Sequence, residues 1–155
     1  NSCVWYYRKV IDKIGIENMQ KELNYLNFGN CDISEWNGNS LNSSADTNGF
    51  WLSSSLKVSP LEQVKILASI FENKTNYKKS DVEMLKNLMC FEQAADYSIY
   101  GKTGTGRNNE GWFAGFMEKG GKRYYFAVIM HDSSSEMVSG ATARNAATGI
   151  VKDNF

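Results

Sequence analysis

The residues best suited to chemistry lie in one glycine-rich stretch, Gly101-Lys102-Thr103-Gly104-Thr105-Gly106. A phosphate-binding P-loop would need a glycine five residues before Gly101 and a helix after the Lys-Thr pair. Asp96 occupies the first of these positions, and Asn108-Asn109 follows the stretch instead of a helix-forming run. The P-loop interpretation therefore fails on both counts. The lysine and threonine instead end a predicted strand, where their ammonium and hydroxyl groups could bind a carboxylate.

Further short motifs accompany this K-T-G sequence in a fixed order. They are Ser2-x-Val4, Phe28-Gly29-Asn30, Phe50-Trp51-Leu52 and Gly111-Trp112-Phe113-Ala114-Gly115. K-T-G is itself a signature of penicillin-recognising serine enzymes. In this order and spacing, the chain resembles class D (OXA-type) β-lactamases from Asn1 to Phe155. Each motif alone is weak, but together they are specific. The resemblance implies hydrolysis of β-lactam antibiotics through a serine acyl-enzyme, with a carboxylated lysine as the base.

The sequence departs from that family in two places. The family's S-x-x-K motif, which carries the nucleophilic serine and the lysine, lies upstream of S-x-V, and none occurs at a suitable place here. Phe28 stands where the family commonly has the tyrosine of Y-G-N, although some members also carry phenylalanine. We therefore expect residues 1–155 to be the C-terminal portion of a single penicillin-recognising domain. The N-terminal portion of the same protein would supply the nucleophile and the lysine.

The resemblance assigns three roles near the start of the chain. Ser2 would relay a proton between the nucleophile, the base and the leaving lactam nitrogen, because a hydroxyl both donates and accepts. Val4 would line the lysine pocket and keep it apolar, which favours the neutral amine that reacts with CO2. Trp51 would donate its indole N–H to the carboxylated lysine. The structural alternatives are a helix N-cap for Ser2 and core packing for Val4 and Trp51.

The resemblance assigns the substrate contacts to the second half of the chain. Lys102 and Thr103 would bind the substrate carboxylate, and Gly104 would let the strand approach it closely. Thr105 would offer its backbone N–H to the oxyanion. Arg144 would clamp the carboxylate in bidentate fashion. The alternatives are a solvated strand end for K-T-G and an unpaired surface position for Arg144. No cofactor is implied except CO2 or bicarbonate for the lysine outside this chain, and no metal.

Hydrophobic periodicity and capping signals predict the helices. Helical spacing predicts one helix from Val4 to Gly15 and a second from Ile16 to near Gly29. Ser59-Pro60-Leu61-Glu62 predicts a helix that begins at Pro60, and Ser80-Asp81-Val82-Glu83 predicts another that ends near Met89. The buried stripe of the helix after Pro60 is predicted to be Leu61, Val64, Ala68 and Phe71.

The remaining third of the chain predicts a sheet and a terminal helix. Aromatic and β-branched runs indicate strands at 97–105, 111–119 and 122–131, the last two joined by a Gly-Gly turn. Consecutive apolar residues in the later strands predict that helices cover both faces. Gly140–Lys152 is predicted to be a helix that buries Ala143, Ala146, Ala147 and Ile150. The predicted fold class is α+β, with an antiparallel sheet flanked by helices, β-lactamase/transpeptidase-like.

Composition narrows the class of protein and its partners. The chain has 155 residues, 17 basic against 17 acidic, and 42% hydrophobic residues, which indicates one soluble globular domain. The net charge is zero, so the chain lacks the surplus of basic residues that binding to nucleic acid would require. The longest apolar run, 124–130, is shorter than the roughly 20 residues that span a bilayer. The 3 cysteines are widely spaced and predict buried free thiols. The sequence is compatible with a homodimer and does not specify one.

The start of the chain and the substrate class bear on location. The sequence begins at Asn1 with no initiator methionine and no signal peptide, so we interpret it as a fragment. Substrates of the family lie outside the cytoplasmic membrane. We therefore expect an extracytoplasmic protein, whether secreted, periplasmic or membrane-anchored.

Two rival functions share the motifs. The first is the extracellular sensor domain of a membrane β-lactam receptor, which is acylated once and signals. The second is a transpeptidase or carboxypeptidase of cell-wall synthesis, which would prefer S-x-N at the second motif. Sensors of the family tend to carry a polar asparagine where this chain has Val4, so Val4 favours the hydrolase.

Overall fold

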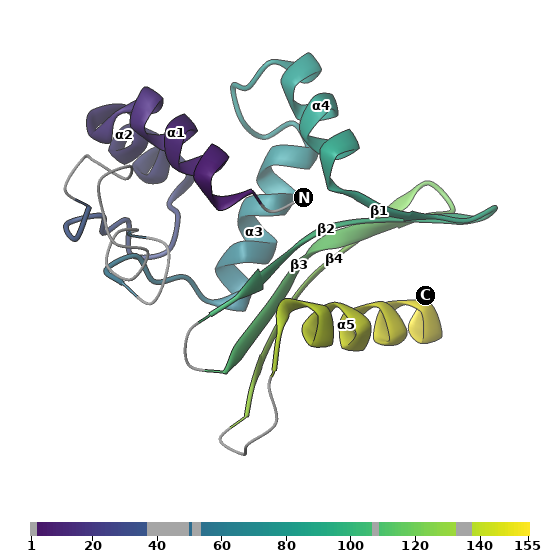
Figure 1. The fold of residues 1–155 in the computed structure, drawn as a ribbon. Coiled ribbons are helices and arrows are strands. Elements are labelled where there is room, and N and C mark those ends of the chain that lie inside the picture. The colour runs from purple at the N-terminus through teal and green to yellow at the C-terminus, as the bar shows by residue number, and fades with distance from the viewer. Residues whose placement is uncertain (1–2, 37–49, 51–53, 107–108, 133–137) are drawn as a thin grey trace. The chain divides into compact units, whose positions relative to one another are not determined.

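The computed structural model describes residues 3–36, 50, 54–106, 109–132 and 138–155. Its backbone contacts divide the chain into two compact units, residues 1–59 and 60–155. The helices and strands of both units are labelled in Figure 1.

The first unit contains two helices joined by a single glycine. Helix α1 spans Val4–Ile14 and helix α2 spans Ile16–Leu26, as predicted. Gly15 can make the sharp reversal between them because its φ of 81° is costly for a residue with a Cβ. A small apolar core in this unit contains Leu23 of α2 and three other buried side chains, Ile33, Trp36 and Phe50.

The second unit contains a four-stranded antiparallel sheet. The strands are β1 (Cys90–Gln93), β2 (Tyr97–Thr105), β3 (Glu110–Lys119) and β4 (Lys122–His131), in the order β1-β2-β3-β4. The predictions for β2, β3 and β4 are confirmed to within one residue. Strand β1 was missed, because four residues are too few to show an alternating pattern.

Helices cover both faces of the sheet, as predicted. Helix α5 (Gly140–Asn154) lies on one face, and α3 (Pro60–Phe71) and α4 (Lys79–Met89) lie on the other (Figure 1). The α+β class is therefore confirmed. Because side chains alternate along a strand, each strand contributes to two separate apolar layers.

The layer under α5 is built from large side chains of the sheet and small ones of the helix. Its buried members are Ile99, Phe113, Met117, Ala143, Ala147 and Val151. The prediction for Ile150 was wrong, because its side chain is 58% exposed and Val151 takes the buried position. The helix rotates so that its alanines, which allow close approach, face the sheet.

The opposite layer is aromatic and holds α3 and α4 on the sheet. Phe71, Val82, Tyr100 and Phe116 form its buried centre. Leu61 was predicted to be buried but is 62% exposed, and Ile66 is the buried residue in that part of α3. Helix α4 begins two residues earlier than the predicted capping box allows. Its N-cap is Lys78, and Ser80 lies inside the first turn.

Ion pairs gather at the end of the sheet that holds the β3–β4 hairpin. Glu118 binds Lys86 and Arg123, each with an N–O distance of 2.7 Å. Burial by itself would raise the pKa of Glu118, but these two hydrogen bonds outweigh it and lower the pKa. Arg123 also donates to the Phe71 carbonyl and lies 3.5 Å from Glu72. The network ties α3, α4 and both hairpin strands together.

The described residues contain no helix long and apolar enough to cross a membrane. They also contain no group of three or more histidine, cysteine or acidic side chains placed to hold a metal ion. Cys3, Cys31 and Cys90 are free thiols. The prediction that all are buried was wrong, because Cys3 and Cys31 are half-buried and Cys90 is exposed.

Candidate active site

The K-T-G residues form the last part of strand β2, Lys102–Thr105. Their register partners on β3 run from Ala114, opposite Lys102, to Gly111, opposite Thr105. Ile99 belongs to the layer under α5 and Tyr100 to the layer under α3 and α4. Alternation along the strand therefore places the two threonines on the α5 face and Lys102 on the opposite face.

The outer edge of β2 is paired over only part of its length. Strand β1 pairs with Ser98, Ile99 and Tyr100, and no described strand pairs with the outer edge of residues 101–105. An edge of this kind presents backbone N–H and C=O groups to another extended chain or to a ligand with amide groups. The K-T-G end of the strand is therefore the part that can accept a substrate along its backbone.

The start of α5 packs directly against the K-T-G residues. The backbone N–H of Gly140 donates to Oγ1 of Thr105 at 2.9 Å. A Cβ on Gly140 would lie 2.7 Å from the carbonyl oxygen of Gly104 and 2.9 Å from Cβ of Thr103. Only glycine allows this approach. The hydroxyl of Thr105 thus fastens the helix, a role that sequence reasoning missed when it assigned this residue a backbone contact alone.

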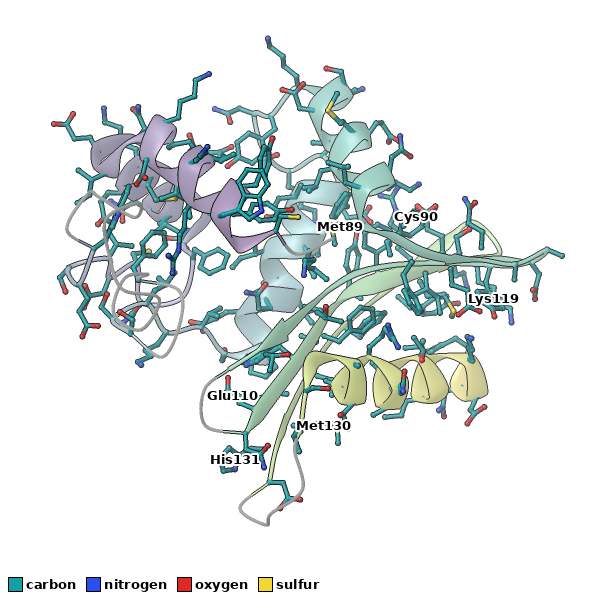
Figure 2. The ribbon with its side chains drawn as sticks, viewed as in Figure 1. Met89, Cys90, Glu110, Lys119, Met130 and His131 are labelled. Atoms are coloured by element: carbon teal, nitrogen blue, oxygen red, sulfur yellow. The ribbon has the colours of Figure 1, made fainter. Side chains whose placement is uncertain are left out.

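Two further contacts hold the start of α5 in place. Ser139 and Thr142 form a capping box, in which each side chain accepts from the other residue's backbone N–H. Asn109 donates from Nδ2 to the carbonyl of Asp132 at 3.0 Å and accepts from the backbone N–H of Val138 at 2.7 Å. Glu110 and His131 lie at this end of the sheet, and Lys119 lies at the other (Figure 2). His131 ends β4, as predicted.

Lys102 carries the cation of the site. Its Nζ donates to the carbonyl of Thr103 at 2.7 Å. Burial lowers the pKa of Lys102 below its ordinary value. A partly desolvated ammonium interacts more strongly with a nearby anion than a fully hydrated one does, because water screens it less. The role of Lys102 in carboxylate binding stays a prediction.

Arg144 is engaged by an aromatic ring rather than unpaired at the surface. Its Cζ lies 4.9 Å from the centre of the Phe91 ring, and its Nε and Nη2 donate to Oδ1 of Asn145 at 3.3 and 3.1 Å. Arg144 therefore has local partners, and its role as a carboxylate clamp stays a prediction. Phe91 lies in β1, the strand that sequence reasoning missed, so no signal in the sequence pointed to this partner.

The Phe28-Gly29-Asn30 motif has a local structural role in the first unit. Gly29 has a φ of 56°, and a Cβ there would lie 1.9 Å from the carbonyl oxygen of Lys57. Asn30 accepts from the backbone N–H of Lys57 at 2.9 Å and donates to the carbonyl of Ser55 at 2.9 Å. The motif therefore fastens the segment that leads into α3.

Three of the predicted residues belong to the first unit, and their side chains are not among the described ones. Ser2 and Trp51 lie outside the described residues. The backbone of Val4 begins α1, but its side chain is not described. The structure therefore brings together Lys102, Thr103, Gly104 and Thr105 in the second unit, with Arg144 on the helix beside them.

The sequence does contain one S-x-x-K tetrapeptide, Ser54-Ser55-Leu56-Lys57, but its conformation is not helical. Ser54 and Ser55 form a bend, and the next helix begins only at Pro60. A helix would place a serine and a lysine three residues apart on the same face, and this segment is not helical. Ser54 donates to Glu35 instead. This tetrapeptide therefore does not supply the nucleophile and the base.

The family model described as penicillin binding protein transpeptidase domain matches residues 1–152. Among curated proteins, "Probable beta-lactamase YbxI" of Bacillus subtilis is 34% identical over 97% of this chain. "Regulatory protein BlaR1" of Bacillus licheniformis is 32% identical over 97% of this chain.

Solved structures give the same two groups of relatives. The class D β-lactamase from Bacillus subtilis has a TM-score of 0.83 and 34% identity, over 98% of this chain and 58% of that one. The C-terminal domain of the Bacillus licheniformis BlaR penicillin receptor has a TM-score of 0.82 and 29% identity, over 98% of this chain and 58% of that one. The chain spans 51% of YbxI and 24% of BlaR1.

Proposed function

This chain belongs to the penicillin binding protein transpeptidase domain family, with class D β-lactamases and BlaR1 regulatory proteins among its homologues, and we propose that it is part of a β-lactam hydrolase. The observation that carries the proposal is the K-T-G end of β2. There a strand edge that no described strand pairs, a partly desolvated lysine and the packed start of α5 occur together. The extracytoplasmic location of the β-lactamases and receptors of this family supports the same location here.

The proposed reaction follows from the groups that the motifs supply. A serine hydroxyl from an S-x-x-K segment outside residues 1–155 attacks the lactam carbonyl carbon, and the lactam C–N bond breaks. The nitrogen takes up a proton that Ser2 relays. Lys102 and Thr103 hold the substrate carboxylate, and the backbone N–H of Thr105 stabilises the oxyanion. Water then cleaves the serine ester and releases the ring-opened acid.

The base of the second step would be a lysine of that same S-x-x-K segment, carboxylated by CO2. Val4 and Trp51 are the residues of this chain proposed to serve it. An apolar Val4 disfavours charge on the amine, and the indole N–H of Trp51 gives the carboxylated side chain a donor. Trp51→Ala is therefore expected to slow deacylation more than acylation, and added bicarbonate is expected to restore part of the rate. Normal deacylation in this variant would assign Trp51 to core packing.

A second candidate function is a β-lactam sensor that is acylated without turnover. It is favoured by the 32% identity to the BlaR1 regulatory protein of Bacillus licheniformis. Position 4 separates the two candidates. A polar amide there can hydrogen-bond the lysine and compete with its carboxylation, whereas Val4 cannot.

The experiment uses the full-length protein, by which we mean the polypeptide that carries this chain together with its S-x-x-K segment. Stopped-flow absorbance with a chromogenic cephalosporin and bicarbonate is expected to show many turnovers per active site. Val4→Asn is expected to give a burst near one equivalent followed by a much slower rate, with the acyl adduct visible by mass spectrometry.

Val4→Ile is the matched control, because it keeps the position apolar and is expected to keep turnover. If the unmutated protein stops after one equivalent, the sensor function replaces the hydrolase. If it never forms an acyl adduct, both candidate functions fail.

A further inference from the structure

We infer that Phe91 is a positioning residue for substrate binding, which holds Arg144 beside the K-T-G edge of β2. The inference rests on the proposed function, because it takes a carboxylate-bearing β-lactam as the ligand of Arg144. It adds a residue from a strand that carries none of the family motifs.

An irregularity in β1 aims the Phe91 ring. The register of β1 on β2 shifts between Cys90, opposite Tyr100, and Glu92, opposite Ile99, which leaves Phe91 as the extra residue. A β-bulge of this kind turns one side chain away from its regular direction. The Phe91 ring meets Phe113 edge-on at 6.1 Å, and Phe113 is buried in the layer under α5. The bulge therefore directs the ring to the α5 face.

The same ring supports the guanidinium of Arg144. Cζ of Arg144 lies 4.9 Å from the ring centre, within the range of a cation–π contact. A guanidinium that lies over a ring keeps its N–H groups in its own plane, where they remain able to donate. Oδ1 of Asn145 accepts from the Nε and Nη2 edge. The contact restricts the long arginine side chain without covering its donors.

The position of the pair is what connects it to substrate. Pairing between β1 and β2 ends at Cys90 and Tyr100, two residues before the K-T-G residues begin at Lys102. A Cβ on Gly101 would lie 2.5 Å from Cζ of Phe113, the ring that Phe91 meets. Phe91 and Arg144 therefore lie at the point along β2 where its pairing with β1 ends. The start of α5 lies at the far end of the same segment.

The physical effect expected of Phe91 is on affinity rather than on chemistry. Holding a rotamer-rich side chain in its bound conformation lowers the entropy that binding must overcome. Loss of an exposed cation–π contact corresponds to a change of roughly two- to fivefold in binding. Phe91→Leu should therefore raise the half-saturating concentration of a penicillin by that factor. The limiting rate of acylation should stay the same.

The test measures acylation of the full-length protein by a fluorescent penicillin across a range of concentrations. This readout exists for a hydrolase and for a sensor alike. Four variants are compared with the unmutated protein: Phe91→Leu, Phe91→Tyr, Arg144→Ala and the double variant Phe91→Leu/Arg144→Ala. Phe91→Tyr keeps the ring face and is expected to behave as the unmutated protein. The double variant is expected to equal Arg144→Ala alone, because Phe91 acts through the arginine.

A penicillin methyl ester is the matched ligand control, used as a competitor of the fluorescent penicillin. It lacks the carboxylate, so neither Phe91→Leu nor Arg144→Ala should change its apparent affinity. If Phe91→Leu weakens the acid and the ester equally, the effect is general packing and the inference fails. Melting temperature is recorded for each variant. Should Phe91→Leu not fold, Phe91→Met removes the ring with the same expected outcome.

The remaining outcomes separate this inference from the proposed function. If Arg144→Ala weakens binding of the acid and Phe91→Leu does not, Phe91 has no positioning role and the proposed function stands. If Arg144→Ala leaves the acid unaffected, the clamp role and the inference both fail. Absence of any acyl adduct in the unmutated protein overturns the proposed function itself.

Discussion

The two ends of the sheet are held together by different physical means. At the hairpin end, charged side chains of α4, β3 and β4, with Glu72 just after α3, form a network around Glu118 and Arg123. At the K-T-G end, the start of α5 meets β2 through glycine, serine and threonine, with a hydrogen bond from Gly140 to Thr105 and backbone contacts too close for a Cβ.

The difference shows how one sheet can be stable and still present a cation for binding. A lysine inside an ion-pair network has its charge compensated by the protein, as Lys86 has through Glu118. Lys102 donates to the carbonyl of Thr103, and its proposed role is to attract a substrate anion. The ion pairs hold the helices and strands together at the hairpin end. Close packing at the other end fixes the position of α5 against β2. The following variants of the full-length protein test this division.

Lys102→Ala should produce the largest effect, and it should be on activity. Losing a charge-assisted bond to the substrate carboxylate corresponds to about 1.5–3 kcal/mol, or roughly one to two decades in kcat/KM. Stability should barely change, because Lys102 is an exposed strand residue. The measurements are steady-state kinetics and thermal melting. Lys119→Ala is the matched control at the hairpin end, and a comparable loss of kcat/KM there would refute the division.

Gly140→Ala should affect both stability and activity. The added Cβ meets the carbonyl oxygen of Gly104 and Cβ of Thr103, so the helix start or the strand must shift. We expect about 1–3 kcal/mol of destabilisation in chemical denaturation, and weaker substrate binding. Gly149→Ala in the same helix is the control, because nothing lies within 4 Å of that Cβ. Equal effects of the two substitutions would mean that close packing at Gly140 is unimportant.

Glu118→Gln should reduce stability and leave kcat/KM unchanged. Removing the shared acceptor of Lys86 and Arg123 should cost about 1–2 kcal/mol at neutral pH. The pKa of Glu118 is lower in the folded state than its ordinary value of 4.5, so the carboxylate contributes stability above that pH and loses the contribution as pH falls. The free energies of unfolding of the two proteins should therefore converge in acid. A constant difference down to the acid limit would exclude ionisation of Glu118 as the cause.

Ser139→Ala should have the smallest effect. It removes the N-cap side chain of α5, which typically lowers stability by about 1 kcal/mol. Ser139→Asp keeps an acceptor at the cap and adds charge at the helix N-terminus, so it should restore the loss. Differential scanning calorimetry measures both. A larger loss of kcat/KM than of stability would show that the cap also orients K-T-G.

Sequence by itself determined most of the elements and the family of this protein. Helical spacing, the proline at position 60 and the Gly-Gly turn are local signals, and they predicted α1 to α3 and the strands β2, β3 and β4. The order of short motifs identified the family because motif order is carried by the chain itself. The missed strand β1 is short, and its only signal is pairing with β2, which lies elsewhere in the sequence.

Tertiary structure alone decided which side chains are buried and which groups meet. Helical periodicity cannot distinguish Ile150 from Val151, because the rotation of α5 is set by how closely its alanines approach the sheet. The contact of Arg144 with Phe91 joins residues 53 positions apart in sequence. The hydroxyl of Thr105 meets Gly140 in the same way, 35 positions along the chain. Such contacts depend on the path of the backbone between them, and residue types alone do not encode that path.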